Sequence, residues 1–97
     1  MIITGRGTLV EAGRKYRGKR LDKALNAWVK VVENAGWRHF PDLKQSWPRA
    51  DSVSGYVVFD IKGNQFRLAA NVSYKIGVVH VMRVMTHAEY DRWSDKL

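Results

Sequence analysis

Apolar and polar residues recur with two different periods along this chain of 97 residues. Between Arg20 and Asn34 the apolar positions return every three or four residues, which places them on one face of an α-helix. From Tyr56 onward the period changes to two, which is typical of β-strands. The sequence therefore predicts a helical N-terminal half followed by a sheet. The stripe of the predicted helix consists of Leu21, Leu25, Trp28, Val29 and Val32.

Shorter elements are expected in the rest of the N-terminal half. Residues 1–4 are predicted to form a strand, and residues 8–16 a helix that Thr8 caps. The segment from Leu43 to Trp47, which two prolines bracket, is predicted to be one helical turn or an ordered loop. Residues 51–55 are interpreted as a surface connection to the sheet.

The second half is predicted to be an antiparallel meander of three strands. The strands are expected at 56–61, 65–74 and 78–85, with turns at Lys62-Gly63-Asn64 and Lys75-Ile76-Gly77. A last helix is expected from His87 to about Asp95, because Thr86 and Glu89 have the spacing of a capping box. The chain is therefore assigned to the α+β class, as a single domain over residues 1–97.

Strand geometry predicts which side chains share a face of the sheet. The apolar residues at even positions of the middle strand are expected to face the helices, so Arg67 points to the opposite side. If the second turn places Tyr74 opposite Val78, Arg83 lies opposite Ala69 and on the same side as Arg67. A slip of one residue would reverse Arg83, and the sequence alone leaves that alternative open.

Charge points to a class of partner. Seventeen Lys and Arg residues against nine acidic ones give a net charge of +8 and an isoelectric point near 10.1. Such an excess is the electrostatic signature of a protein that binds a polyanion. Residues 1–50 carry most of it, with 11 basic and 4 acidic side chains. Nucleic acid is therefore the first partner to consider.

Composition excludes several other classes. The chain has no cysteine, so disulfides, thiolate metal clusters and a catalytic thiol are excluded, and a reducing cytoplasm suits it. Its apolar runs are too short for a signal peptide or a transmembrane helix, so a soluble protein without a membrane partner is expected. His39, His80 and His87 lack metal-ligand spacing, and no metal or other cofactor is predicted.

The predicted face would bring cations and proton-transfer groups together. Arg67 and Arg83 are candidates to hold a scissile RNA phosphate, and Lys62 would assist from the hairpin turn. His87 and Tyr90, at the start of the following helix, are candidates for proton transfer or for orienting the nucleotide. Such a set suits cleavage by attack of a ribose 2′-hydroxyl on the adjacent phosphate, without a metal. The acid and the base stay unassigned.

Plainer interpretations of the same residues stay open. The two arginines are also explained as solvated charges or as partners of Asp60 and Glu89, and Tyr90 as a residue that docks the last helix. The tryptophans at 28, 37 and 47 are interpreted as packing residues. A module that binds RNA or the ribosome without cutting is the alternative function, whereas a DNA-binding factor is disfavoured because no helix-turn-helix is evident.

Two stretches of the sequence resemble the HigB-type toxins of the RelE superfamily. They are Asp60-Ile61-Lys62-Gly63-Asn64-Gln65-Phe66-Arg67-Leu68 and Val84-Met85-Thr86-His87-Ala88-Glu89-Tyr90-Asp91, of which the second is the more specific. The similarity continues upstream through Leu25-Asn26-Ala27-Trp28, Ala35-Gly36-Trp37 and Trp47-Pro48, so it covers nearly the whole chain. Asp60 departs from the family pattern by standing where asparagine is common, and Met85 by standing where a glycine often precedes the Thr-His pair.

The resemblance implies a RelE-like fold and ribosome-dependent cleavage of messenger RNA. It also implies neutralisation by a HigA-type antitoxin, whose helix-turn-helix domain binds the promoter of the operon. By position, it supports a catalytic face of Arg67, Arg83, His87 and Tyr90, with Lys62 and Asn64 in the hairpin as RNA-binding residues. An acid at position 60 would weaken the binding of RNA near that face.

Overall fold

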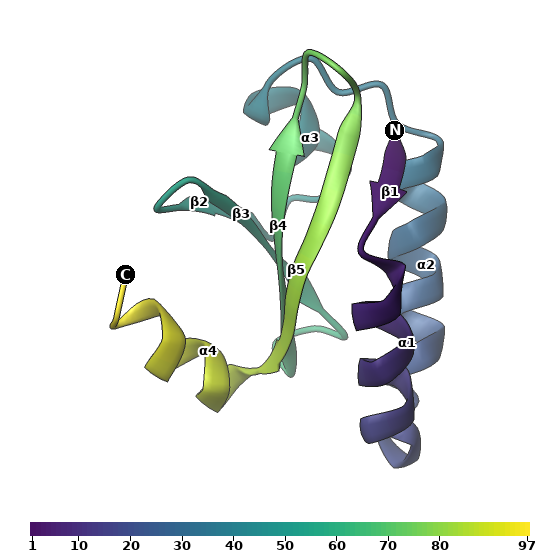
Figure 1. The fold of residues 1–97 in the computed structure, drawn as a ribbon, viewed down its shortest axis with the longest axis vertical. Helices are drawn as coiled ribbons and strands as arrows, with labels where there is room; N and C mark the ends of the chain where they lie inside the picture. Colours follow the sequence, from purple (N-terminus) through teal and green to yellow (C-terminus); the bar gives the residue numbers. More distant parts are fainter.

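The computed structural model describes residues 1–97. The protein consists of a five-stranded sheet with helices on both faces (Figure 1). The elements in chain order are β1 (Ile2–Thr4), α1 (Arg6–Lys15), a 3₁₀ turn (Arg17–Lys19), α2 (Leu21–Glu33), α3 (Phe40–Ser46), β2 (Ala50–Val53), β3 (Tyr56–Ile61), β4 (Phe66–Ser73), β5 (Val78–Thr86) and α4 (His87–Ser94). The predicted α+β class is confirmed. Figure 1 shows α1 and α2 side by side on one face of the sheet and α4 on the other face. No helix combines the length and the apolar character needed to cross a membrane.

The strands lie in the order β1-β5-β4-β3-β2. β2, β3, β4 and β5 form the antiparallel part, which includes the predicted meander. β1 joins the other edge in the parallel direction, with Ile3 opposite Val79. The first strand of the chain therefore lies beside the last one (Figure 1).

Two apolar clusters hold the layers together. The larger one lies between the sheet and the pair α1 and α2, where the ring of Trp28 packs edge-on against that of Phe59 at 5.3 Å. The smaller one lies on the opposite side, called the α4 face below, and joins Val58, Ala69 and Met85 to side chains of α4. Trp28 is fully buried and Trp37 nearly so, which confirms their interpretation as packing residues.

The pairing of β4 with β5 changes register part-way along. Near the turn, Ser73 lies opposite Val78, whereas the sequence analysis paired Tyr74 with Val78, so the prediction was wrong by one residue there. The register then shifts between Ala69 and Ala70. Such a shift is a β-bulge, in which one strand contributes an extra residue and twists locally.

The bulge decides where Arg83 points. Beyond it, Arg83 lies opposite Ala69, as predicted. Without the extra residue in β5, Arg83 would lie opposite Leu68 and would point into the main core, because a shift of one residue reverses a side chain. Met82 and Arg83 are instead consecutive exposed residues of β5. Arg83 therefore shares the α4 face with Arg67.

The segment predicted as a surface connection from Asp51 to Gly55 is largely a strand. Ala50–Val53 forms β2 and pairs with β3, with Asp51 opposite Val58, and only Ser54 and Gly55 form the turn. The prediction was wrong because the short polar run resembles a loop. At the edge of a sheet, polar side chains are compatible with a strand, since one side of the strand faces solvent.

Two helices begin earlier than predicted. α1 begins at Arg6 rather than Thr8, and its N-cap is Gly5 in the left-handed conformation, with φ of 77°. A side chain at Gly5 would place its Cβ 2.5 Å from the carbonyl oxygen of Val81, so the position requires glycine. α3 extends from Phe40 to Ser46, and the Nδ1 atom of His39 accepts a hydrogen bond from the Asp42 amide at 3.3 Å at its start.

Candidate active site

Arg67 and Arg83 project from neighbouring strands on the α4 face. Arg67 lies opposite Met85 and Arg83 lies opposite Ala69, so the two arginines are diagonal neighbours across β4 and β5. Side chains in that relation are about 7–8 Å apart at their bases. The structure therefore brings the two predicted cations to one surface.

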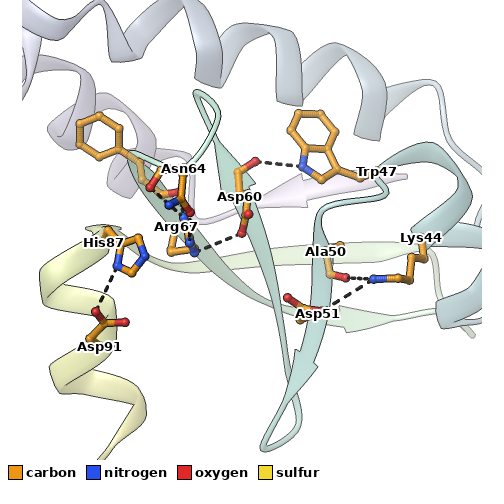
Figure 2. A network of polar contacts seen from close by, with 10 residues as sticks. Lys44, Trp47, Ala50, Asp51, Asp60, Asn64, Arg67, His87 and Asp91 are labelled. Carbon is orange, nitrogen blue, oxygen red and sulfur yellow. Dashed lines mark hydrogen bonds and ion pairs between the residues drawn. The ribbon is translucent and has the colours of Figure 1, made fainter.

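Arg67 is held almost entirely by protein groups. Its guanidinium is the one charged group among the buried residues, and its Nε atom lies 3.1 Å from the Oδ1 atom of Asp60. Nη2 donates to the side-chain oxygen of Asn64 at 2.5 Å, and Nη1 donates to the carbonyl oxygens of Asn64 and Phe66 at 3.3 and 3.1 Å. Figure 2 shows this arrangement at the β3–β4 hairpin. The ion pair with Asp60 is thus one of the plainer interpretations realised.

Arg83 is the exposed cation of the pair. Its guanidinium carbon lies 5.7 Å from the centre of the Trp93 ring, and the structure contains no ion pair to it. Trp93 in turn packs edge-on against Tyr56 at 5.1 Å. A guanidinium that rests on an aromatic face keeps its N–H groups available for an anion. Glu89, the alternative partner for this arginine, is occupied elsewhere.

Glu89 closes the predicted capping box of α4. Its Oε1 atom accepts from the Thr86 amide at 2.8 Å, and its own amide donates to the Thr86 hydroxyl at 3.1 Å. The hydroxyl of Tyr16, the C-cap residue of α1, also donates to Oε1 at 3.1 Å. The bond from the Thr86 amide contributes most to lowering the pKa of Glu89, with smaller contributions from Tyr16 and Lys15, whereas burial opposes the shift. α4 is therefore fixed both by its own cap and by the helical layer.

His87 is the first residue of α4 and is oriented by two contacts. Its amide donates to the carbonyl oxygen of Gln65 at 3.1 Å, which anchors the helix start beside the hairpin. Its Nδ1 atom lies 3.1 Å from the Oδ2 atom of Asp91, one helical turn on. The side chain of His87 is 44% exposed, so its ring is accessible to a substrate in solution. A histidine held by a carboxylate through one nitrogen presents the other for proton transfer.

Tyr90 lies next to the buried arginine. The Cζ atom of Arg67 is 5.6 Å from the centre of its ring, and the ring packs on the small apolar cluster of the α4 face. Burial raises the pKa of Tyr90, while the positive charge of Arg67 acts in the opposite direction. The phenol is therefore protonated at neutral pH and can donate a hydrogen bond or a proton. The packing also confirms that Tyr90 docks α4.

The two hairpin residues predicted to bind RNA differ in their contacts. Lys62 is exposed, has a positive φ of 55°, and its ammonium group donates to the carbonyl oxygen of Lys19. Asn64 is committed to Arg67 through both its side chain and its carbonyl group. The contact of Trp93 with Arg83 and the bond of Tyr16 to Glu89 were not predicted from the sequence. Nothing local in the sequence indicates either contact.

Comparison with known proteins places this site in a family. Residues 21–93 match the HigB toxin family, described as the RelE-like toxic component of a toxin–antitoxin system. The chain belongs to the HigB toxin family. All six predicted site residues lie within the matched range, and the α+β architecture is compatible with the RelE-like fold that the resemblance implied. Membership also implies an antitoxin partner, as the resemblance did.

Curated HigB relatives are similar over nearly their whole length. The mRNA interferase HigB of Escherichia coli O6:H1 is 25% identical over 95 residues, which cover 95% of this chain and 90% of the relative. The mRNA interferase toxin HigB of Escherichia coli K12 is 27% identical over 94 residues, with 94% and 88% covered. The mRNA interferase HigB of Shigella flexneri gives the same values.

Proposed function

We propose that this chain is a messenger-RNA endonuclease that acts on the ribosome and is neutralised by a HigA-type antitoxin. Similarity to relatives that are named mRNA interferases supports the reaction class. A net charge of +8 supports an RNA substrate. The single observation that carries the proposal is that Arg67 and Arg83 share the α4 face, where Tyr90 lies beside Arg67 and His87 begins α4 next to the β3–β4 hairpin.

The proposed reaction is an internal transfer at phosphorus. The ribose 2′-oxygen attacks the adjacent phosphorus, the bond to the 5′-oxygen of the next nucleotide breaks, and a 2′,3′-cyclic phosphate forms. The proton of the 2′-hydroxyl passes to a base, and the leaving 5′-oxygen takes a proton from an acid. The proposed proton transfers use side chains of the protein alone. The structure has no group of three or more His, Asp or Glu side chains that could hold a metal ion.

The contacts of each side chain suggest its role. Arg83 is free to bind the non-bridging phosphate oxygens, and charge on those oxygens grows in the transition state. The Nε2 atom of His87 accepts or donates a proton, with Asp91 holding the ring. Tyr90, neutral at pH 7, serves as a donor. Lys62 attracts the RNA from the hairpin, and Asn64 keeps the guanidinium of Arg67 in place beneath the site.

The Arg67–Asp60 pair favours one alternative, a module that binds RNA or the ribosome without cutting. A guanidinium has five N–H groups, and Arg67 already has four protein acceptors, so its capacity for a phosphate is small while Asp60 stays bound. A site with one available arginine can still bind RNA. It stabilises the transition state of cleavage less than a site with two available arginines, which is why the pair favours binding without cleavage.

The experiment that separates these functions follows messenger RNA on translating ribosomes in the presence of purified chain. We expect cleavage that leaves 2′,3′-cyclic phosphate ends, and a loss of about 10²–10⁴-fold in rate for Arg83→Ala and for His87→Gln. Arg92→Ala is the matched control, because it removes an exposed arginine from α4, the helix that carries His87. This variant should cut normally. Intact RNA, or wild-type effects that survive both site substitutions, would favour the binding module. Ends that carry a 5′-phosphate would contradict the 2′-hydroxyl route.

The antitoxin is proposed to have an acidic docking surface, because the toxin carries a net charge of +8. Its complex with the chain should weaken as salt rises and the Debye length falls from about 10 Å at 0.1 M. Promoter DNA is proposed to bind only through the antitoxin. An affinity for the antitoxin that does not change with salt, or a promoter shift by the chain alone, would contradict these two points.

A further inference from the structure

A polar cleft is lined in part by Asp60, the residue that pairs with Arg67. It has a volume of about 400 Å³ and opens between the end of α3 and the β3–β4 hairpin turn. That volume falls within the range of about 300–1,000 Å³ that is typical of small-ligand sites. Its walls come from Ser46 to Arg49 on one side and from Asp60, Lys62 and Gly63 on the other. The cleft is therefore large enough to take one nucleotide.

The cleft has a fixed aromatic wall. The indole of Trp47 donates from Nε1 to the carbonyl oxygen of Asp60 at 3.0 Å, as Figure 2 shows. Its ring also packs edge-on against Phe59 at 6.2 Å. These two contacts set the position of the ring before any ligand arrives. An immobile aromatic side chain is the kind of surface against which unpaired bases pack.

The electrostatics of the cleft are cationic. Arg49 is exposed, and its guanidinium has no ion pair or hydrogen bond within the protein, where only its carbonyl group is used. The ammonium group of Lys62 contacts a neutral carbonyl oxygen, so its charge is not compensated. The single acid in the lining, Asp60, is neutralised by Arg67 at 3.1 Å. Two positive charges thus face the cleft without a counter-charge.

We infer that this cleft is a subsite for a nucleotide that neighbours the scissile phosphate, with Arg49 and Lys62 on its phosphate and Trp47 beside its base. The inference rests on the proposed function, because it places the same RNA strand on the α4 face. Asp60 connects the two places, since its carboxylate holds Arg67, its carbonyl oxygen accepts from Trp47, and the residue lines the cleft. Arg49, Trp47 and Ser46 thereby join the RNA-contacting surface, although none of them was predicted from the sequence to bind RNA.

The test measures binding rather than cleavage, with a single-stranded RNA in which 2′-O-methyl groups prevent any reaction. Binding to the purified full chain is followed by fluorescence anisotropy at several salt concentrations. Loss of one phosphate contact by Arg49→Gln should reduce the slope of log K against log salt by about 0.7 and the affinity at 0.1 M salt about fivefold. Arg49→Lys, which keeps the charge, should restore most of the slope. Lys23→Gln removes one exposed charge from α2 and is the matched control, with a clearly smaller change.

RNA length gives a second measurement. As nucleotides are removed from one end, the strand becomes too short to reach the cleft, and the difference between wild type and Arg49→Gln should vanish at that length. Equal losses for Arg49→Gln and Lys23→Gln at every length would overturn the inference. So would an Arg49→Gln variant that binds RNA normally and loses affinity for an acidic antitoxin, since the cleft would then be a protein-docking site. If the wild type binds in this way and does not cut RNA on ribosomes, the proposed catalysis fails and the subsite stands.

Discussion

The buried ion pair between Asp60 and Arg67 makes a prediction in which stability and RNA binding change in opposite directions. The perturbation is Asp60→Asn, which removes one negative charge and keeps the shape of the side chain. The backbone contacts of residue 60, to Trp47 and to the carbonyl oxygen of Arg49, do not depend on the carboxylate. The substitution therefore isolates the charge of the pair.

The geometry of the pair sets the size of the stability effect. The two side chains are 16% and 10% exposed and meet at 3.1 Å. Removing one partner of a buried pair costs about 3–5 kcal/mol, because an unpaired charge is left behind. Asparagine keeps an oxygen that can accept from the Nε atom of Arg67, so we expect a smaller loss of roughly 1–3 kcal/mol in the free energy of unfolding. In a domain of this size that corresponds to a fall in Tm of roughly 5–20 °C.

RNA binding should move the other way. Asp60→Asn raises the net charge from +8 to +9 and leaves the guanidinium of Arg67 uncompensated beside Tyr90. One additional phosphate contact would steepen the salt dependence by about 0.7 and tighten binding about fivefold at 0.1 M salt.

The assay combines urea unfolding, followed by tryptophan fluorescence, with anisotropy titrations of uncleavable RNA. Asp51→Asn on the neighbouring strand is the matched control, because Asp51 is 72% exposed and lies 3.7 Å from the Nζ atom of Lys44. An exposed pair of that kind contributes about 0–1 kcal/mol. The Asp60 carboxylate is expected to stabilise the fold and to keep the guanidinium of Arg67 from binding RNA. This role would be refuted if Asp60→Asn lost no more stability than Asp51→Asn, or bound RNA no better than wild type.

Three further predictions concern α4 and the bulge. Glu89→Gln should make the free energy of unfolding depend less on pH in the acid range. The bond from the Thr86 amide lowers the pKa of Glu89 in the folded protein below its ordinary value of 4.5. The stabilisation by the ionised carboxylate is therefore present above pH 4.5 and is lost as the pH falls through the pKa of the folded state. Urea unfolding from pH 3 to 6 checks this, and an unchanged profile would count against it. Tyr90→Phe should bind RNA normally and cut it about 10²–10⁴-fold more slowly in single-turnover assays; an unchanged rate would leave Tyr90 only its docking role. Deleting Met82, the extra residue of the bulge, should leave Arg83 opposite Ala69. Deleting Val84 should shift the residues after it to the opposite faces of the sheet. Thermal unfolding should therefore show a smaller fall in Tm for the Met82 deletion than for the Val84 deletion.

The fold could be predicted from sequence where one face of an element is buried. α2 runs from Leu21 to Glu33 and β3 from Tyr56 to Ile61, within one residue of the predicted bounds, because apolar periodicity reports burial directly. β2 was missed because its polar residues lie on an edge and carry no such signal. The start of α1 was missed because Gly5 caps it through its backbone conformation, without a side-chain hydrogen bond.

The placement of the site was predictable from the sequence, but only some of its contacts were. Alternation along β4 correctly put Arg67 on the side of the sheet away from α1 and α2. Arg83 was placed correctly although the register near the turn was wrong, since the bulge compensates for the error. A bulge has no sequence signature of its own here. The contact of Tyr16 with Glu89 joins residues 73 positions apart, and local patterns do not report such pairs. The ion pair of Arg67 with Asp60 was one of the interpretations that the sequence left open, and the structure selects it.

The parallel pairing of β1 with β5 has a consequence for how the molecule is made. Ile2 pairs with Val78, so β1 cannot pair with β5 until the residues up to Val78 and beyond have been synthesised. Pairings between such distant residues slow folding, because a long loop must close before the contact gives any stabilisation. Arg83 and His87 are translated after Val78, and the start of α4 is anchored to the hairpin by the His87 amide. A nascent chain thus lacks the proposed phosphate-binding surface until Arg83 and His87 have been translated.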